Sequence, residues 1–133
     1  MPADVPKTNA LRLLASRRVP HEVITFTDDT HSAQGAAAAI GAPLHQVYKT
    51  LVVLRERERP LLVMVPGDGE IDLRLLARSL GEKKLHMATQ REAESLTGLQ
   101  VGGIPALALL NKELRVVVAA SALPWERLLV SAG

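Results

Sequence analysis

Alternating and helically spaced hydrophobic positions divide the chain into short helices and strands. Apolar stripes at helical spacing, with capping residues before them or glycines after them, predict helices over 9–17, 33–40, 73–80 and 89–96. Alternating or continuous apolar runs predict strands over 22–27, 47–54, 61–65, 85–87, 107–110, 115–119 and 127–130. Because helices and strands are interspersed, the expected fold class is α+β, with a mixed β-sheet flanked by helices in a single domain spanning residues 1–133.

Charge and composition narrow the class of protein without identifying it. Sixteen Lys and Arg residues against fourteen Asp and Glu give a net charge of only +2, so any basic surface for nucleic acid must be local. The charged run at 55–59 predicts an exposed hairpin loop. The sequence has no cysteine, which excludes disulfides and a thiol nucleophile. No uncharged run reaches the roughly 18 residues of a membrane helix, and we expect a cytoplasmic protein.

Lys49 is the strongest candidate for a functional side chain, because it interrupts an otherwise apolar strand. Alternation places Lys49 on one face with Leu51 and Val53, and Thr50 on the other face with Val52. One interpretation is a lysine near the start of the strand whose ammonium reaches water. The other is a cation held over a pocket, where it binds phosphate or polarises a carbonyl. The residues alone leave both interpretations open.

Other patterns point to chemistry only weakly. Gly102-Gly103 before Pro105 is typical of a simple turn, although paired glycines also let a backbone approach a ligand closely. The four histidines lack helical i,i+4 spacing and an associated carboxylate cluster, so we expect no metal site. Neither a nucleophile elbow nor a phosphate loop or dinucleotide fingerprint occurs, and no cofactor is expected.

Motifs in a fixed order along the whole chain resemble one protein family. They are His31-Ser32 opening an Ala-rich helix that ends at Ile40-Gly41, the 46–52 segment around Lys49, the helix from Asp72-Leu73 to Leu80-Gly81, Lys83-Lys84, Thr97-Gly98, the Gly-Gly-Ile loop at 101–104 and the final segment 129–133. This set resembles the YbaK/ProX family of trans-editing aminoacyl-tRNA deacylases, which are similar to the editing domain of bacterial prolyl-tRNA synthetases. The Gly-Gly-Ile loop looks most like the YbaK branch, which is associated with Cys-tRNA(Pro).

The resemblance implies an activity and a set of site residues. The activity is hydrolysis of the ester that joins a wrong amino acid to the tRNA 3′ end, with the substrate's own cysteine thiol taking part in the YbaK branch. The tRNA 3′ end is the implied partner, and prolyl-tRNA synthetase is a further candidate. Lys49 would be the catalytic residue, in contact with the 3′-terminal phosphate or the ester. The implied substrate-binding residues are Phe26, His31, Thr50, Gly102, Gly103, Ile104, Ser131 and Gly133.

The chain departs from the family pattern at three places. Pro105 stands where the family loop usually has serine, and Ala119-Ala120 stand where an acidic pair is usual. The family continues after its Ser-x-Gly motif with an Arg-Gly segment, a strand and a short helix, so we expect a domain without that C-terminal segment. These departures keep alternatives open: a deacylase for Ala- or Ser-charged tRNA, a non-catalytic module that binds tRNA ends or a synthetase, and a relic that binds neither. The sequence also leaves the oligomeric state open.

Overall fold

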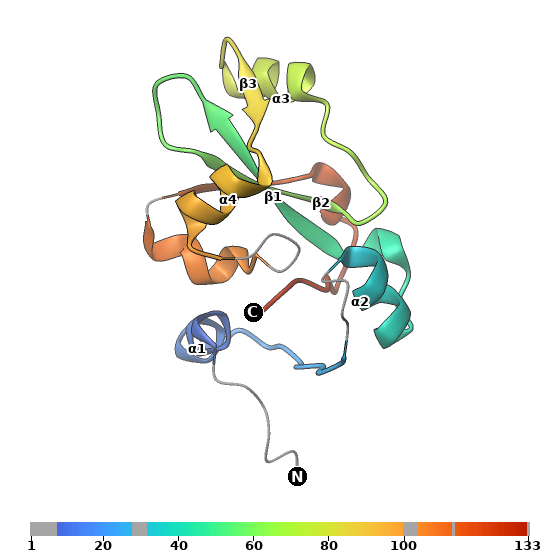
Figure 1. Cartoon of the computed structure of the whole chain (residues 1–133). Helices are drawn as coiled ribbons and strands as arrows, with labels where there is room; N and C mark the ends of the chain where they lie inside the picture. Colours follow the sequence, from blue (N-terminus) through green and yellow to red (C-terminus); the bar gives the residue numbers. More distant parts are fainter. Residues whose placement is uncertain (1–7, 28–31, 100–103, 113, 133) are drawn as a thin grey trace.

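The computed structural model describes residues 8–27, 32–99, 104–112 and 114–132. Helices and short 3₁₀ turns surround a central sheet, with α3 beside β3 at one end of the molecule and α1 at the other (Figure 1). The elements are α1 (Asn9–Ser16), α2 (Ala33–Ile40), η1 (Leu44–Gln46), β1 (Tyr48–Arg55), β2 (Leu61–Pro66), α3 (Leu73–Leu80), β3 (Leu85–Met87), α4 (Gln90–Thr97), η2 (Ala106–Lys112), β4 (Arg115–Val118) and η3 (Ala120–Ala122). Within these described ranges, no helix has the length and apolar character needed to cross a membrane.

The sheet has four strands in the order β3-β1-β2-β4. β1 is antiparallel to both β2 and β3, whereas β2 and β4 are parallel. The charged run at 55–59 forms the loop between β1 and β2, as predicted. Because β1 and β2 occupy the two inner positions, their side chains are screened from water on both faces, which explains their nearly continuous apolar sequence. The predicted mixed sheet is confirmed.

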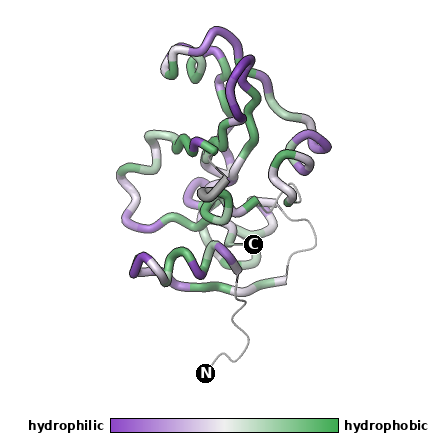
Figure 2. Tube along the Cα trace, turned by 90° about the vertical axis from the view of Figure 1, so that its left-hand side faces the viewer, coloured by the Kyte–Doolittle hydropathy of each residue, from purple (hydrophilic) through white to green (hydrophobic). Residues whose placement is uncertain are grey.

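Each face of the sheet carries its own apolar cluster. On one face, Val52 and Leu62 pack with Leu109 of η2 and Ala93 of α4. On the other, Val53 and Leu61 pack with residues of α3 and with Leu85. Figure 2 shows hydrophobic positions gathered in the central segments of the trace. Leu61, Leu62 and Val53 are fully buried, and burial of such side chains contributes about 1.5–3 kcal/mol each.

Local sequence signals set the helix ends. Ser32 and Asp72 accept hydrogen bonds from backbone N–H groups in the first turns of α2 and α3. Gly41, Gly81 and Gly98 end α2, α3 and α4 in the left-handed conformation, which costs glycine little. The predicted bounds of α2 and α3 are confirmed. The predicted helix over 9–17 ends one residue earlier, because Arg17 is the C-cap.

The predicted strand over 22–27 is wrong. This stretch is extended in shape but has no strand partner among the described residues, and residues 19–27 are all exposed. Val23, Ile24 and Phe26 are therefore apolar side chains at the surface, with Phe26 44% exposed. β-branched alternation marks a segment that can adopt a strand, but a strand forms only where a neighbour accepts its backbone hydrogen bonds.

Two further predicted strands are corrected by the structure. Residues 107–110 lie inside the 3₁₀ segment η2, and the Ala108 N–H donates to the Pro105 carbonyl. Leucine and alanine lack the β-branching that favours strands, and Pro105 sets the first turn. Residues 127–130 form no strand; Leu129 makes a single parallel bridge to Val47.

Candidate active site around Lys49

Lys49 is the second residue of β1, so its backbone is fixed by the sheet. Leu51 and Val53 belong to the apolar cluster on the α3 face, and strand alternation places Lys49 on that face. Thr50 lies on the opposite face with Val52. The predicted division of this strand between two faces is confirmed.

The ammonium of Lys49 has one hydrogen bond and no acidic partner within the described residues. Its Nζ donates to the carbonyl of Gly67, but over a long 3.4 Å, and the residue is half-buried. Among the described residues, no carboxylate lies within 4.0 Å of this ammonium. An ammonium has three donors, so at least two remain for a ligand. The geometry suits a cation that can turn from a protein carbonyl to a substrate oxygen.

Gly67 brings three segments together beside Lys49. Its N–H donates to the Val47 carbonyl at 2.7 Å, and its own carbonyl accepts from Lys49. A Cβ at this position would lie 2.6 Å from Leu44 Cδ1, 2.9 Å from the Cβ of Ala33 and 3.0 Å from the Val47 carbonyl oxygen. Only glycine leaves room for α2 and η1 to close on the start of β1. The sequence signal for this close approach is a glycine directly after a buried strand.

The C-terminal segment lies along the start of β1. The Tyr48 N–H donates to the Leu129 carbonyl at 2.9 Å, and the Leu129 N–H donates to the Gln46 carbonyl at 3.2 Å. These bonds form the parallel bridge between Val47 and Leu129. The C-terminal segment and β3 lie along the same edge of β1. The backbone groups of residues 46 and 48 bond to Leu129 on this edge, and farther along the strand the Val52 carbonyl accepts from Ala88, directly after β3.

This pairing carries Ser131 toward the candidate lysine. The two segments run in the same direction, and Ser131 follows Leu129 by two residues, as Lys49 follows Val47. Two residues advance a strand by about 7 Å. The bridge places Leu129 beside the start of β1, and Ser131, which is half-buried, follows it by two residues.

Tyr48 anchors the same region from inside the core. It is 2% exposed, and its hydroxyl lies 2.8 Å from Ser121 Oγ in η3. Gln46 Nε2 donates to the Arg127 carbonyl at 3.0 Å. Both side chains tie the C-terminal segment to β1. A tyrosine in a buried strand is itself a sequence signal for such a contact, because its hydroxyl requires a partner.

Within the described residues, the structure does not bring the other predicted site residues together with Lys49. Ile104 is 4% exposed and packs with Val52 and Leu62, so it shares the face of Thr50 and not that of Lys49. Phe26 lies on the exposed stretch at 19–27, and its contribution to a pocket wall stays a prediction. His31, Gly102, Gly103 and Gly133 lie outside the described residues.

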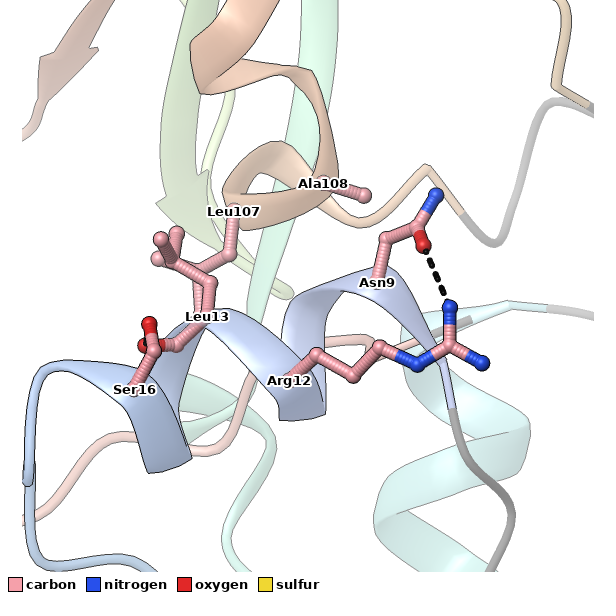
Figure 3. A pocket seen from close by; sticks show the side chains of 6 residues that line it. All are labelled: Asn9, Arg12, Leu13, Ser16, Leu107 and Ala108. Atoms are coloured by element: carbon pink, nitrogen blue, oxygen red, sulfur yellow. Dashed lines mark hydrogen bonds between the residues drawn. The ribbon is translucent and has the colours of Figure 1, made fainter.

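A shallow cavity of about 350 Å³ lies elsewhere, between α1 and η2 (Figure 3). Leu13 and Leu107 form its apolar wall, and Arg12 donates to Asn9 Oδ1 over 3.3 Å at its open side. It contains none of the predicted site residues. In the part of the chain that the structure describes, no group of three or more His, Asp or Glu side chains is arranged to hold a metal ion.

Comparison with known proteins identifies the family. The family described as "Aminoacyl-tRNA editing domain" matches residues 27–133. A protein of Enterococcus faecalis, provisionally named Cys-tRNA(Pro)/Cys-tRNA(Cys) deacylase EbsC, is 32% identical over 129 residues, covering 96% of this chain and 78% of that protein. The proline–tRNA ligase of Thermodesulfovibrio yellowstonii is 32% identical over 77 residues, which are 58% of this chain and 13% of the ligase.

A solved structure supports the same assignment. A crystal structure described as a candidate trans-editing enzyme for prolyl tRNA synthetase superposes with a TM-score of 0.74 and 29% identity, covering 93% of this chain and 80% of that chain. The predicted resemblance to YbaK/ProX-type deacylases and the predicted α+β fold are confirmed by these matches. This chain belongs to the aminoacyl-tRNA editing domain family, a family of hydrolytic enzymes that act on aminoacyl-tRNA.

Proposed function

We propose that this chain hydrolyses Cys-tRNA(Pro) and that Lys49 is the catalytic residue in contact with the substrate. The observation that carries the site is the half-buried ammonium of Lys49, rooted in a core strand and held by one 3.4 Å hydrogen bond to Gly67. The substrate is inferred from the E. faecalis relative, whose name specifies it and which aligns with 96% of this chain.

The reaction needs a water molecule and a place for developing negative charge. Water attacks the ester carbonyl carbon, and the carbonyl oxygen becomes an oxyanion. The bond to the ribose oxygen then breaks, the ribose oxygen takes a proton, and free amino acid and tRNA are released. An ammonium within hydrogen-bond reach of the oxyanion stabilises it, and the loss of one such contact typically costs on the order of 10²–10³ in rate. With no cysteine in the chain, the protein contributes position and charge and no thiol.

The remaining pocket residues follow from the arrangement around β1 and from the family resemblance. Thr50 is next to Lys49 in β1 and Ser131 follows the bridge at Leu129 by two residues, and on these positions we assign both to substrate binding. Ile104 is assigned to the pocket by the resemblance alone, since it packs with Val52 on the face opposite Lys49. The resemblance adds Phe26, His31, Gly102, Gly103 and Gly133.

A panel of Cys-, Ala- and Ser-charged tRNA(Pro) tests the activity and its selectivity. We expect free cysteine to be released fastest, and alanine and serine more slowly. Lys49→Ala should lower kcat/KM for the preferred substrate by on the order of 10²-fold or more. Arg91→Ala, an exposed change on α4, is the control and should retain full activity.

The outcomes separate the activity from the site. If Lys49→Ala hydrolyses the substrates as fast as the wild type, the assignment of Lys49 is wrong. If the wild type binds tRNA but releases no amino acid from any charged species, the chain is a binding module and the proposed hydrolysis is wrong.

Prolyl-tRNA synthetase is the proposed partner in trans. The chain is similar to segments of proline–tRNA ligases, and a structural neighbour is described as an editing enzyme for that synthetase. If the protein acts together with this synthetase, it is a cytoplasmic protein. Addition of purified prolyl-tRNA synthetase to the deacylation reaction should raise the rate; an unchanged rate over a range of synthetase concentrations would remove this partner.

A further inference from the structure

Basic side chains gather at the end of the molecule opposite the start of β1. The β1–β2 loop, the end of α3 and the turn into β3 meet there, because Arg55 pairs with Leu85 in the sheet and α3 packs against β3 (Figure 1). Figure 2 shows hydrophilic positions at the same end. The basic end comprises Arg55, Arg57, Arg59, Arg78, Lys83 and Lys84.

The acidic residues at this end are largely occupied by one arginine. Arg55 Nη1 lies 2.5 Å from Glu58 Oε2 and 3.4 Å from Glu82 Oε1. Among the described residues of this end, Glu56 is the third acidic side chain, and it is exposed. Six basic against three acidic residues give the basic end a balance of +3, whereas the whole chain carries +2. The rest of the chain is therefore slightly acidic, and the positive potential is local to this end.

Four exposed cations at the basic end make no ion pair within the described residues that would explain their presence there. Arg57, Arg78, Lys83 and Lys84 are exposed, and none has an ion-pair partner among the described residues. Lys83 and Lys84 are adjacent in the chain, and like charges repel one another within the screening length of about 8 Å at physiological salt. A polyanion with regularly spaced charges would relieve that repulsion.

We propose that the basic end binds the phosphate backbone of the tRNA acceptor duplex. This inference rests on the proposed function, because it takes the ester to lie at Lys49. Lys49 and Arg55 are six residues apart on β1, which corresponds to about 20 Å. The single-stranded 3′ tail of the tRNA separates the ester from the duplex, so a surface that binds duplex phosphates has to lie away from the lysine, as the basic end does. The basic end carries no Phe, Tyr or Trp, so binding there is electrostatic and independent of base sequence.

The test compares Lys83→Gln/Lys84→Gln with Arg12→Gln/Arg17→Gln, a control that removes the same charge from exposed positions on and after α1. Binding of uncharged tRNA(Pro) is measured by fluorescence anisotropy between 50 and 200 mM salt. The lysine pair should weaken binding by on the order of tenfold and reduce the slope of log K against log salt by about 2. The control should change binding by less than about twofold.

A second substrate separates this surface from the active site. Hydrolysis of a cysteinyl ester on a short single-stranded 3′ oligonucleotide should be the same for the lysine pair and the wild type, whereas kcat/KM on full-length charged tRNA should fall. The proposal is overturned if the lysine pair keeps wild-type affinity and salt slope, or if the short ester loses as much rate as the tRNA. Wild-type failure to hydrolyse either substrate refutes the proposed function, while the anisotropy measurement still decides whether the basic end binds tRNA.

Discussion

Replacement of Gly67 by alanine tests how the start of β1 is held. The new Cβ would lie 2.6 Å from Leu44 Cδ1, 2.9 Å from the Cβ of Ala33 and 3.0 Å from the Val47 carbonyl oxygen. Leu44 can move because its methyl ends a flexible side chain. The other two contacts belong to backbone or to a Cβ, so α2 or the turn must shift.

The expected cost follows from two opposing terms. Overpacking of a tight site typically costs about 1–3 kcal/mol. Replacement of glycine by alanine also reduces the entropy of the unfolded chain, which stabilises by about 0.4–1 kcal/mol. We expect a net loss of about 1–2 kcal/mol in the free energy of unfolding and a Tm lower by roughly 3–10 °C. Because the Gly67 carbonyl accepts from Lys49, kcat/KM should also fall.

Gly69→Ala is the matched control in the same turn. A Cβ there would meet Pro66 at 3.4 Å, which is ordinary van der Waals contact. This variant should be as stable as the wild type or slightly more stable. The free energy of unfolding of all three proteins is measured by urea denaturation. Equal stability of Gly67→Ala and Gly69→Ala would show that the close approach at Gly67 does not hold the site.

Two further changes address α4 and the core tyrosine. The hydrogen bond from the Thr89 N–H to Glu92 Oε1, 3.0 Å long, holds the pKa of that carboxyl below its usual value of 4.5. A lowered pKa in the folded state contributes stability above the unfolded pKa that is lost as the pH falls through the folded pKa. Urea denaturation should therefore show Glu92→Gln less stable than the wild type at pH 7, with a smaller difference at pH 3; an equal difference at both would contradict the capping role. Tyr48→Phe removes the hydroxyl that lies 2.8 Å from Ser121 and should cost about 0.5–1.5 kcal/mol in the same assay, whereas an unchanged value would mean that water replaces this bond.

Features that depend on a few neighbouring residues were predictable from the sequence. The capping box of Thr89 and Glu92 involves positions three residues apart, and both of its hydrogen bonds are present. Asp72 and Gly81 likewise bound α3 as their positions predict. The prediction of a strand over 22–27 was wrong because apolar alternation is a local property of the sequence, whereas a strand also needs a partner from elsewhere in the chain. An apolar run such as 107–110 fits either a strand or a buried 3₁₀ turn, and the turn that begins with the Ala108 N–H bond to the Pro105 carbonyl is what the structure shows.

In the candidate site, too, residues with a local sequence signal were predictable and residues constrained by distant segments were not. Lys49 was visible because it is a charged residue in an apolar strand. Gly67 was not, because its constraint comes from Leu44 and Ala33, which are more than twenty positions away in the chain. Ser131 was assigned only by resemblance; the bridge at Leu129 supplies its physical connection to β1.

These contacts fix the backbone from which the flexible side chain of Lys49 starts. The backbone before Lys49 is held on one edge by the Gly67 N–H at Val47 and on the other by Leu129 at Tyr48. The buried ring of Tyr48 points away from the lysine and fixes the strand to η3. Only the side chain of Lys49 then remains free to move, from the 3.4 Å bond with Gly67 to a substrate oxygen. A catalytic group works best when its supporting residues limit its positions, and for the role we propose for Lys49 that support comes from segments at three distant places in the sequence.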